Sequence, residues 1–339
     1  MPRTRDFLVA VLGILRAGFA VVPMDSEYPA KRINAILKDA DCSLCISSGD
    51  LLSKATDVSL LDLDQILQAK PNEDIDYGLN LSEAEAEGLI LFTSGTTGKP
   101  KGVVHRQSIF SNGPDVLKEY HQFAESDVTC CMAGLTFIIS TVDLYAPLMV
   151  GGSVYLADEM ERKNVKLLHQ IIEKHGVTGM YLPPQMFQVM RELYGPLPLA
   201  YVLLSGEKAQ SKYAGDGNLL EFYGSTEAAG VLAHRIAGED HRILGKPCGS
   251  AKVYLLAENG ERITTPGAVG EFCVASPYIA IGYNNLPEET AAKFTDNPFH
   301  PAEAPLYHSG DYMASLKSYK LYSNPNLNDS HGIKHTENL

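Results

Sequence analysis

A stretch rich in glycine, hydroxyl and lysine residues carries the strongest chemical signal of the chain. It runs Leu91-Phe-Thr-Ser-Gly-Thr-Thr-Gly-Lys-Pro-Lys-Gly-Val-Val-His105. Glycines let the backbone approach an anion closely, hydroxyl groups donate hydrogen bonds to phosphate oxygens, and lysines supply positive charge. A mobile surface loop of the same composition is the alternative. The residues that we predict to bind a polyphosphate are Thr93, Ser94, Gly95, Thr96, Thr97, Gly98, Lys99 and Lys101.

The stretch is not a Walker P-loop. That motif needs a glycine, four further residues and then Gly-Lys-Ser/Thr. Here Thr93 stands at the position of the first glycine, and Pro100 follows Lys99. Its function must therefore be inferred together with the rest of the chain.

Further short motifs follow the loop in a fixed order. They are Tyr223-Gly-Ser-Thr-Glu227, Gly245-Lys-Pro247, Gly270-Glu-Phe272, Gly282-Tyr-Asn-Asn285 and Ser309-Gly-Asp311. With the loop, they resemble the motifs of the adenylate-forming (AMP-binding) superfamily, which includes acyl-CoA synthetases, luciferases and the adenylation domains of nonribosomal peptide synthetases. Upstream, Leu12-Gly-Ile-Leu-Arg-Ala-Gly18 and Val22-Pro-Met-Asp25 are most similar to the peptide-synthetase branch. The resemblance covers residues 1–312.

The resemblance implies a role for each matched residue. The loop would hold the β and γ phosphates of ATP, which leave as pyrophosphate when a carboxylate attacks the α phosphorus. Glu227 would hold Mg²⁺, a cation that prefers oxygen ligands, and Thr226 would contact the α-phosphate. Tyr223 would lie against adenine beside the backbone of Gly206 and Glu207. Asp311 would accept hydrogen bonds from both ribose hydroxyls.

Each of these residues also has a purely structural interpretation. Tyr223 could be a core aromatic residue, Glu227 a carboxylate at a helix N-terminus, and Asp311 a turn residue after glycine. The ordered set of motifs favours the functional interpretation for all three.

The acyl pocket of the family maps onto mostly apolar positions. Amino-acid-activating members have Phe-Asp where this chain has Phe137-Ile138, and that Asp pairs with the substrate ammonium. Burying an uncompensated ammonium beside Ile138 is costly, so we expect an acid without one: a 2-keto, 2-hydroxy, aryl or aliphatic acid. The alternative is that Asp143 serves the amine. The pocket positions are Phe137, Ile138, Ile139, Val142, Tyr181, Leu203, Ser205, Phe222, Gly230 and Val231.

The order of apolar segments predicts an α/β fold. Helices are expected at 6–17, from 29, from about 108, at 161–175 and at 184–193. Strands are expected at 19–22, 43–46, 88–92, 128–132, 153–156, 177–182, 200–204 and 219–223, followed by shorter ones at 251–256 and 270–274. The polar, acidic segment 49–87 is expected to be a loosely structured connection.

These elements predict two parts and a tail. Residues 1–240 would form an α/β AMP-binding core of stacked, mostly parallel sheets flanked by helices. Residues 241–312 would form a small β-barrel-like subdomain of the same core. Residues 313–339 have no counterpart in the resemblance, and we expect them to be a divergent, disordered tail.

The segment after Asp311 departs from the family. There a hinge, a Gly-Arg-x-Asp segment and a small C-terminal lid should follow, and a lid lysine bridges the substrate carboxylate and ATP. Here Ser315-Leu-Lys-Ser-Tyr-Lys leads into a polar tail. We therefore expect the chain to be truncated at both ends and the lid to be absent. Adenylation would be impaired, because that lysine stabilises developing charge.

Composition narrows the partners and the compartment. The chain has 28 Lys and Arg against 41 Asp and Glu, a net charge of −13 that repels nucleic acids and anionic membranes. Six cysteines in 339 residues are too few for a secreted disulfide framework. Targeting and membrane-spanning patterns are missing, so we expect a cytoplasmic protein. Cys42-Ser-Leu-Cys45 is interpreted as a buried pair of small residues rather than a metal or redox site.

The predicted function is ATP- and Mg²⁺-dependent activation of a carboxylic acid as an acyl-adenylate. The acyl group would pass to a carrier-protein phosphopantetheine thiol or to CoA. The alternatives are a fragment of an acyl- or aryl-CoA synthetase, a catalytically weak nucleotide-binding module, or a truncated product without function.

Overall fold

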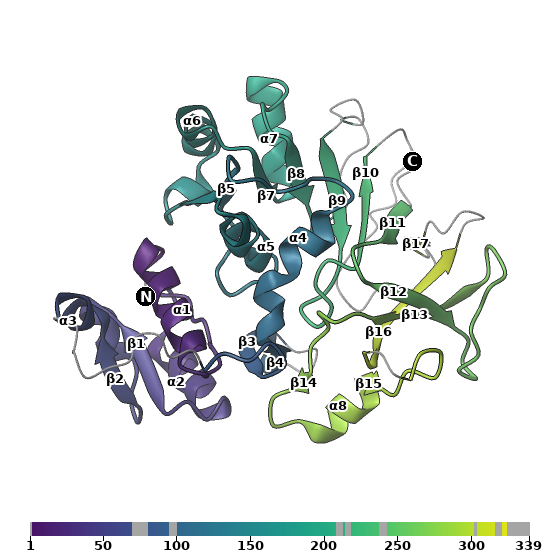
Figure 1. Cartoon of the computed structure of the whole chain (residues 1–339), viewed down its shortest axis with the longest axis horizontal. Helices are drawn as coiled ribbons and strands as arrows, with labels where there is room; N and C mark the ends of the chain where they lie inside the picture. The colour runs from purple at the N-terminus through teal and green to yellow at the C-terminus, as the bar shows by residue number, and fades with distance from the viewer. Residues whose placement is uncertain are drawn as a thin grey trace.

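The computed structural model describes residues 2–69, 81–94, 100–207, 213, 218–236, 243–301, 304–315 and 321–323. Over these ranges the chain forms α-helices and three β-sheets (Figure 1). The α-helices are α1 (Arg5–Arg16), α2 (Ala30–Asp39), α3 (Leu63–Gln68), α4 (Asn112–Leu117), α5 (Ser140–Tyr145), α6 (Val165–His175), α7 (Pro184–Tyr194) and α8 (Pro287–Lys293). The 3-10 turns are η1 (Gly49–Lys54), η2 (Gln107–Ser111), η3 (Leu148–Val150) and η4 (Glu161–Lys163).

The strands fall into an N-terminal, a central and a C-terminal group. The first group is β1 (Leu44–Ser47), β2 (Ser59–Asp62), β3 (Glu87–Ser94) and β4 (Pro100–Arg106). The second is β5 (Val128–Cys131), β6 (Ser153–Leu156), β7 (Gly179–Leu182), β8 (Tyr201–Leu204), β9 (Leu219–Tyr223) and β10 (Leu232–Arg235). The third is β11 (Ile243–Pro247), β12 (Lys252–Leu256), β13 (Val269–Ala275), β14 (Gly282–Tyr283), β15 (Phe294–Thr295), β16 (Leu306–Ser315) and β17 (Leu321–Ser323).

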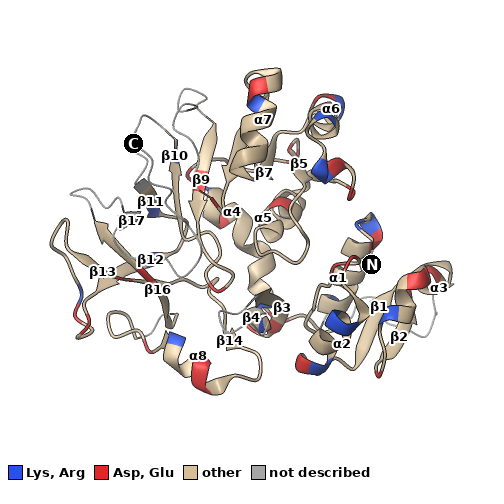
Figure 2. Cartoon of the chain, turned by 180° about the vertical axis from the view of Figure 1, so that it is seen from behind, with Lys and Arg blue, Asp and Glu red and all other residues tan. Residues whose placement is uncertain are grey.

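The largest sheet has twelve strands and is half parallel. Its order is β12-β13-β16-β17-β11-β10-β9-β8-β7-β5-β6, with β15 paired to β16. Strands β5 to β9 are parallel, which requires crossover connections such as those through α6 and α7. Strands β5, β7 and β8 contain no charged residue, as expected for strands that are covered on both faces (Figure 2).

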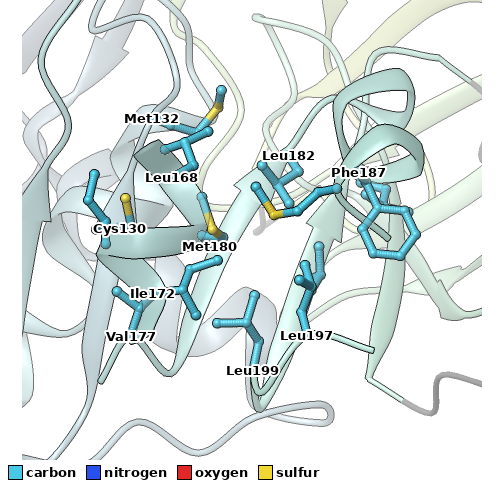
Figure 3. Close-up of a cluster of buried hydrophobic side chains, with 14 of the residues drawn as sticks. Cys130, Met132, Leu168, Ile172, Val177, Met180, Leu182, Phe187, Leu197 and Leu199 are labelled. Atoms are coloured by element: carbon cyan, nitrogen blue, oxygen red, sulfur yellow. The ribbon is translucent and has the colours of Figure 1, made fainter. Parts of the chain in front are cut away.

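Alternating residues of these strands pack into two separate cores. Cys130, Met180 and Val202 face α6 and α7, where Leu168, Ile172, Phe187 and Met190 join them in one cluster (Figure 3). The neighbouring residues Cys131, Tyr181 and Leu203 belong to the clusters on the other face, which α1, α4 and α5 cover. The period of two along a strand therefore builds both layers of the core.

Local signals in the sequence account for the bounds of α6. The Asn164 side chain accepts hydrogen bonds from the backbone N–H groups of Lys166 (3.0 Å) and Leu167 (3.2 Å). Gly176 ends the helix in the left-handed conformation, at φ 60°. The cap and the terminating glycine place the helix over β5 and β7.

The antiparallel half of the large sheet is the β subdomain. β10 and β11 pair across the boundary that we expected at residue 240, so one sheet runs through both parts. β16 also continues past residue 312 to Ser315 and pairs with β17. Met313 and Ala314 are each 2% exposed. The ordered sheet therefore extends beyond the predicted start of the tail, while 316–320 and 324–339 lie outside the described residues.

The N-terminal region differs from the sequence expectation in two places. Segment 19–22 is not a strand: it makes one β-bridge, Val21 to Leu89, and Phe19 is 66% exposed. Segment 49–87 is not simply a loose connection, because η1, β2 and α3 lie within it and β2 pairs with β1 in a parallel ladder. The strand Ser59–Asp62 carries a weak hydrophobic pattern, because only Leu60 and Leu61 are apolar.

The two cysteines of the CxxC motif join a small apolar core. Cys42 and Cys45 are free thiols packed near Ile33 and Leu37, and burial raises the pKa of Cys42 to about 11. Both thiols therefore stay protonated at neutral pH.

No helix within the described ranges is long and apolar enough to cross a bilayer.

A substitution at Gly179 tests the packing of β7 against the Tyr201 ring of β8. A Cβ built there would lie 2.1 Å from Cε1 of Tyr201, its fully buried partner on β8. We expect Gly179→Ala to lower the free energy of unfolding by about 1–3 kcal/mol, measured by urea denaturation. Gly13→Ala is the control, since no atom lies within 4 Å of its built Cβ and alanine favours the helix by up to about 1 kcal/mol. Equal midpoints for Gly179→Ala and the wild type would contradict the packing.

Candidate active site

The predicted phosphate loop is the tip of the β3–β4 hairpin. Thr93 pairs with Lys101 across the two strands, and Ser94 pairs with Pro100. Residues 95–99, which include Gly95, Thr96, Thr97, Gly98 and Lys99, lie outside the described residues. A third strand, β14, pairs with β4 at Val103 and Val104, so β3 and β4 belong to a three-stranded sheet.

Lys101 is fixed by helix α8. Its ammonium forms an ion pair with Glu289, and Nζ lies 5.5 Å from the centre of the Tyr283 ring. The Lys101 side chain is 19% exposed. The predicted phosphate contact is therefore already paired with a carboxylate in the ligand-free protein.

Glu227 is held by two elements of the chain. Its Oε1 accepts a hydrogen bond from the Tyr283 hydroxyl (2.9 Å), and its backbone carbonyl accepts one from the N–H of Ala280 (2.8 Å). Burial, reinforced by the negative charge of Glu227, raises the pKa of both Tyr283 and Tyr307. Both phenols therefore stay protonated at neutral pH, and that of Tyr283 donates to Glu227.

His105 ties β4 to the segment that carries Thr226 and Glu227. Its ring Nε2 lies 2.8 Å from the carbonyl oxygen of Thr226, so we assign the proton to Nε2. The residue is 1% exposed, and this burial lowers its pKa to about 4. His105 is thus a neutral donor at physiological pH, and it fixes the backbone from which the Thr226 side chain projects.

Tyr223 and Asp311 meet from opposite halves of the large sheet. The Tyr223 hydroxyl donates to Oδ2 of Asp311, and its ring packs edge-on against Phe272, with centroids 5.6 Å apart. Ser309 positions the acid: its hydroxyl donates to the Phe272 carbonyl at 2.6 Å and accepts from the N–H of Asp311 at 3.0 Å. The predicted adenine and ribose contacts therefore lie together. A small cavity is lined by Tyr223, Ser225, Ala228, Val231, Phe272, Tyr307, Ser309 and Asp311.

Gly206 and Glu207 follow β8, next to the strand that ends at Tyr223. Because β8 and β9 are parallel, their carboxyl ends lie at the same edge of the sheet. Gly206 has φ +94°, with no atom within 4 Å of a built Cβ, and Glu207 accepts a hydrogen bond from Gln185 at 3.1 Å. The predicted neighbours of the adenine are thus at the same edge as Tyr223.

Most of the predicted acyl-pocket residues share one cluster. Ile139, Val142, Tyr181, Leu203 and Phe222 pack together with Val116 and Leu117 of α4. A Cβ built on Gly230 would lie 3.6 Å from the Phe222 ring, and the Tyr181 hydroxyl donates to the Ser205 carbonyl at 3.4 Å. These positions therefore form one apolar wall between α4, α5 and the sheet.

Three predicted pocket residues lie elsewhere. Phe137 is 64% exposed, and Ile138 packs into the cluster of α1 and β3. The turns that lead into α5 rotate successive residues, so Ile139 and Val142 share a face that excludes Ile138. Val231 packs in the cluster that Tyr223 adjoins.

Asp143 is buried behind this wall. It is fully buried, and its Oδ2 accepts a hydrogen bond from the backbone N–H of Tyr181 at 3.2 Å. Burial raises its pKa to about 8, so the carboxyl is mostly neutral at pH 7. A neutral carboxyl that bonds to the backbone of β7 is poorly suited to pair with a substrate ammonium.

Four residues around this site were not assigned roles from the sequence. His105 and Tyr283 lay inside recognised motifs, so a signal existed for both. Tyr307 lies two residues before Ser309 of the Ser309-Gly-Asp311 motif and could have been found in the same way. Glu289 carried no signal, because only the fold brings α8 to Lys101.

The family model for AMP-binding enzymes matches residues 1–284. The chain belongs to this family. It is similar to Surfactin synthase subunit 2 of Bacillus subtilis (strain 168), with 32% identity over 315 residues that cover 91% of this chain and 9% of that protein. It is also similar to a dimodular nonribosomal peptide synthase of the same organism, with 31% identity over 92% of this chain and 14% of the relative. The chain of this AMP-binding enzyme thus spans a small part of the peptide synthetases it resembles.

Solved structures agree with the fold of the AMP-binding family. The N-terminal subdomain of Klebsiella oxytoca NpsA, in complex with 3-hydroxybenzoyl-AMSN, has a TM-score of 0.84 at 21% identity and covers 95% of this chain and 84% of that one. AB3403, a four-domain nonribosomal peptide synthetase bound to AMP and glycine, has a TM-score of 0.82 at 25% identity, over 95% of this chain and 24% of that one. The predicted α/β core with a small β subdomain is confirmed.

The burial of His105 predicts a pH dependence of stability. Below pH ~6.5 the unfolded chain takes up a proton that the folded protein binds only near its pKa of about 4. Stability is therefore fully present above pH ~6.5 and decreases by about 3 kcal/mol as the pH falls toward 4. His105→Gln lacks this titration, so its free energy of unfolding, from urea curves, should depend less on pH by about that amount.

His175→Gln, a change at an exposed histidine of α6, is the matched control and should keep the wild-type profile. Parallel profiles for His105→Gln and the wild type between pH 7 and 4 would contradict the assignment of a neutral buried imidazole.

Proposed function

We propose that this AMP-binding enzyme binds ATP and joins the α-phosphate to a carboxylic acid, forming an acyl-adenylate. The observation that carries the proposal is the convergence of Lys101, Glu227, Tyr223 and Asp311. These residues come from three separate stretches of the chain, and their chemical types match a triphosphate, a cation, an adenine and a ribose. The carboxylate oxygen attacks the α phosphorus, the bond to the β-phosphate oxygen breaks, and pyrophosphate leaves.

Glu227 fits a role as a ligand for Mg²⁺. Its Oε1 accepts a hydrogen bond from the Tyr283 hydroxyl at 2.9 Å, which orients the carboxylate. Mg²⁺ is bound by one or two carboxylates together with phosphate oxygens and water, so a single orienting carboxylate is a sufficient protein ligand. The bound cation would neutralise phosphate charge, while Tyr283 orients the carboxylate toward it.

The remaining residues would exchange partners when ATP binds. Lys101 would exchange its ion pair with Glu289 for one with a phosphate oxygen, because the phosphate, like the Glu289 carboxylate, is negatively charged. Asp311 would leave the Tyr223 hydroxyl for the ribose hydroxyls, which frees the Tyr223 ring to lie against adenine. The Thr226 side chain, on a backbone fixed by His105, would contact the α-phosphate. The loop residues from Thr93 to Lys99 would hold the β and γ phosphates.

The acid is proposed to be one without an α-ammonium. The wall formed by Ile139, Val142, Tyr181, Leu203 and Phe222 is apolar, and the neighbouring Asp143 is neutral and bonded to the backbone. A 2-keto, 2-hydroxy, aryl or aliphatic acid would lie there without an unpaired charge.

The proposed acceptor of the acyl group is a carrier-protein thiol. NpsA-ThdA, an artificially fused adenylation and PCP di-domain from Klebsiella oxytoca, has a TM-score of 0.85 with this chain at 20% identity. Holo-PA1221, described as containing adenylation and PCP domains, has a TM-score of 0.81 at 21% identity. We also propose a cytoplasmic location, where ATP is available.

Asp311→Ala tests the nucleotide site. Removing the acceptor of two ribose hydrogen bonds should weaken ATP binding about tenfold or more, measured by calorimetry with Mg²⁺ present. Asp64→Ala, at an exposed carboxylate on α3, is the matched control and should bind as the wild type does. Equal affinity in all three proteins would contradict the assigned ribose contact.

Exchange of labelled pyrophosphate into ATP tests the reaction and the acid class. With a panel of acids, we expect exchange above background for acids without an α-ammonium and less for the ordinary α-amino acids. Glu227→Gln should reduce the exchange at least tenfold, because the cation loses a charged ligand. ATP binding without exchange for any acid would instead support a nucleotide-binding module, and a preference for α-amino acids would refute the acid class.

A further inference from the structure

Three side chains with metal-binding chemistry meet on the β subdomain, on the same strands as the Asp311 cavity but alternating with the residues that line it. They are Glu271 and Cys273 on β13 and His308 on β16. Their ligand atoms all lie within 4.8 Å of one another. The His308 Nδ1 is 3.4 Å from Sγ of Cys273 and 3.0 Å from Oε2 of Glu271. The imidazole nitrogen is therefore the common neighbour of a thiol and a carboxylate.

The sheet imposes this arrangement. Cys273 and His308 are direct partners in the antiparallel ladder of β13 and β16. Glu271 lies two residues before Cys273, so its side chain emerges on the same face. The register shifts between Glu271 and Cys273, and the backbone N–H of Gly310 donates to Oε1 of Glu271 at 3.2 Å. The irregular ladder thus anchors one carboxylate oxygen and leaves the other beside the imidazole.

The orientation of His308 suits a metal ligand. Its Nε2 lies 3.1 Å from the Thr295 hydroxyl, which can accept the Nε2 proton. An outer hydrogen bond of this kind fixes the tautomer and the ring direction of metal-binding histidines. In this structure Nδ1 donates its hydrogen bond to the carboxylate oxygen Oε2 of Glu271, because an ionised carboxylate only accepts. A cation would take the place of that proton, with the imidazole proton on Nε2 toward Thr295.

The burial of the cluster leaves an approach from one side. Cys273 is fully buried, whereas the side chains of His308 and Glu271 are 22% and 24% exposed. The Cys273 thiol therefore lies at the buried side of the site, and the side chains of His308 and Glu271 form its solvent-accessible rim. The fourth position of a tetrahedral site would face solvent and take a water molecule.

We propose that Glu271, Cys273 and His308 bind a divalent cation of borderline softness, with Zn²⁺ as the best match. A thiolate with an imidazole and a carboxylate suits Zn²⁺, whereas Mg²⁺ prefers oxygen ligands alone. On binding, the sulfur–metal bond forms, the thiol proton passes to solvent, and no electron is transferred. The site shares no residue with the proposed ATP site, so it does not depend on the proposed function.

Titration of the whole chain with Co²⁺, a spectroscopic substitute for Zn²⁺, tests the site. We expect one equivalent to produce the charge-transfer absorption of a thiolate bound to cobalt, with one proton released per ion. Addition of Zn²⁺ should remove the absorption. Cys273→Ser should abolish it, whereas Cys248→Ser, a matched change at another buried free cysteine, should leave it intact.

The two rim residues keep the test decisive if Cys273→Ser fails to fold. His308→Gln and Glu271→Gln lie at partly exposed positions, and each should weaken Co²⁺ binding at least tenfold. Thr295→Val should weaken it about tenfold through the loss of the outer hydrogen bond. The proposal is overturned if stoichiometric Co²⁺ gives no thiolate band, if the band persists in Cys273→Ser, or if both rim variants bind like the wild type.

Discussion

The burial of a parallel sheet on both faces is the constraint on which the rest of the structure depends. Strands β5 to β9 can be parallel only if crossover segments return over the sheet, and covered faces favour strands made mostly of apolar residues. Two cores result, one below α6 and α7 and one against α1, α4 and α5. Parallel strands also align their carboxyl ends. Gly206, which follows β8, and Tyr223, which ends β9, therefore lie at the same edge of the sheet.

The antiparallel half of the sheet supplies the other side of the site. Because β10 and β11 continue the ladder, the β subdomain is joined to the core by backbone hydrogen bonds, and β16 presents Asp311 to Tyr223. The charged residues of the site are each held in the ligand-free protein: Lys101 by Glu289, Glu227 by Tyr283 and Asp311 by Tyr223. In the proposed function, nucleotide affinity would be the difference between the interactions lost and those gained, so the Glu289 ion pair would lower the affinity for ATP.

The sequence predicts the elements of the core well and their contacts less well. The helix expected at 161–175 begins at Val165 instead, because Glu161–Lys163 forms a 3-10 turn and Asn164 caps the helix; its apolar stripe and terminating Gly176 were local signals of its presence and its end. Segment 19–22 has the apolar residues of a strand, and its pattern therefore predicted one. In the structure it makes one isolated β-bridge, from Val21 to Leu89, so the prediction was wrong. In the site, ordered motifs pointed to Glu227, Tyr223 and Asp311, and the structure brings Tyr223 and Asp311 into contact. The partner Glu289 was invisible, because no local pattern encodes the approach of α8 to the β3–β4 hairpin.

The acyl wall shows how a small rotation changes a functional inference. Alignment of short motifs placed Ile138 where a carboxylate would meet a substrate amine, yet the turns before α5 direct Ile138 into the neighbouring core and leave Ile139 and Val142 on the wall. The nearby acid, Asp143, is kept neutral by burial, and only one of its oxygens receives a hydrogen bond from the described residues. An ionised carboxyl at that depth would destabilise the fold unless a cation neutralised it. The apolar character of the wall therefore rests on both the identity of the residues that face it and the protonation of the acid behind it.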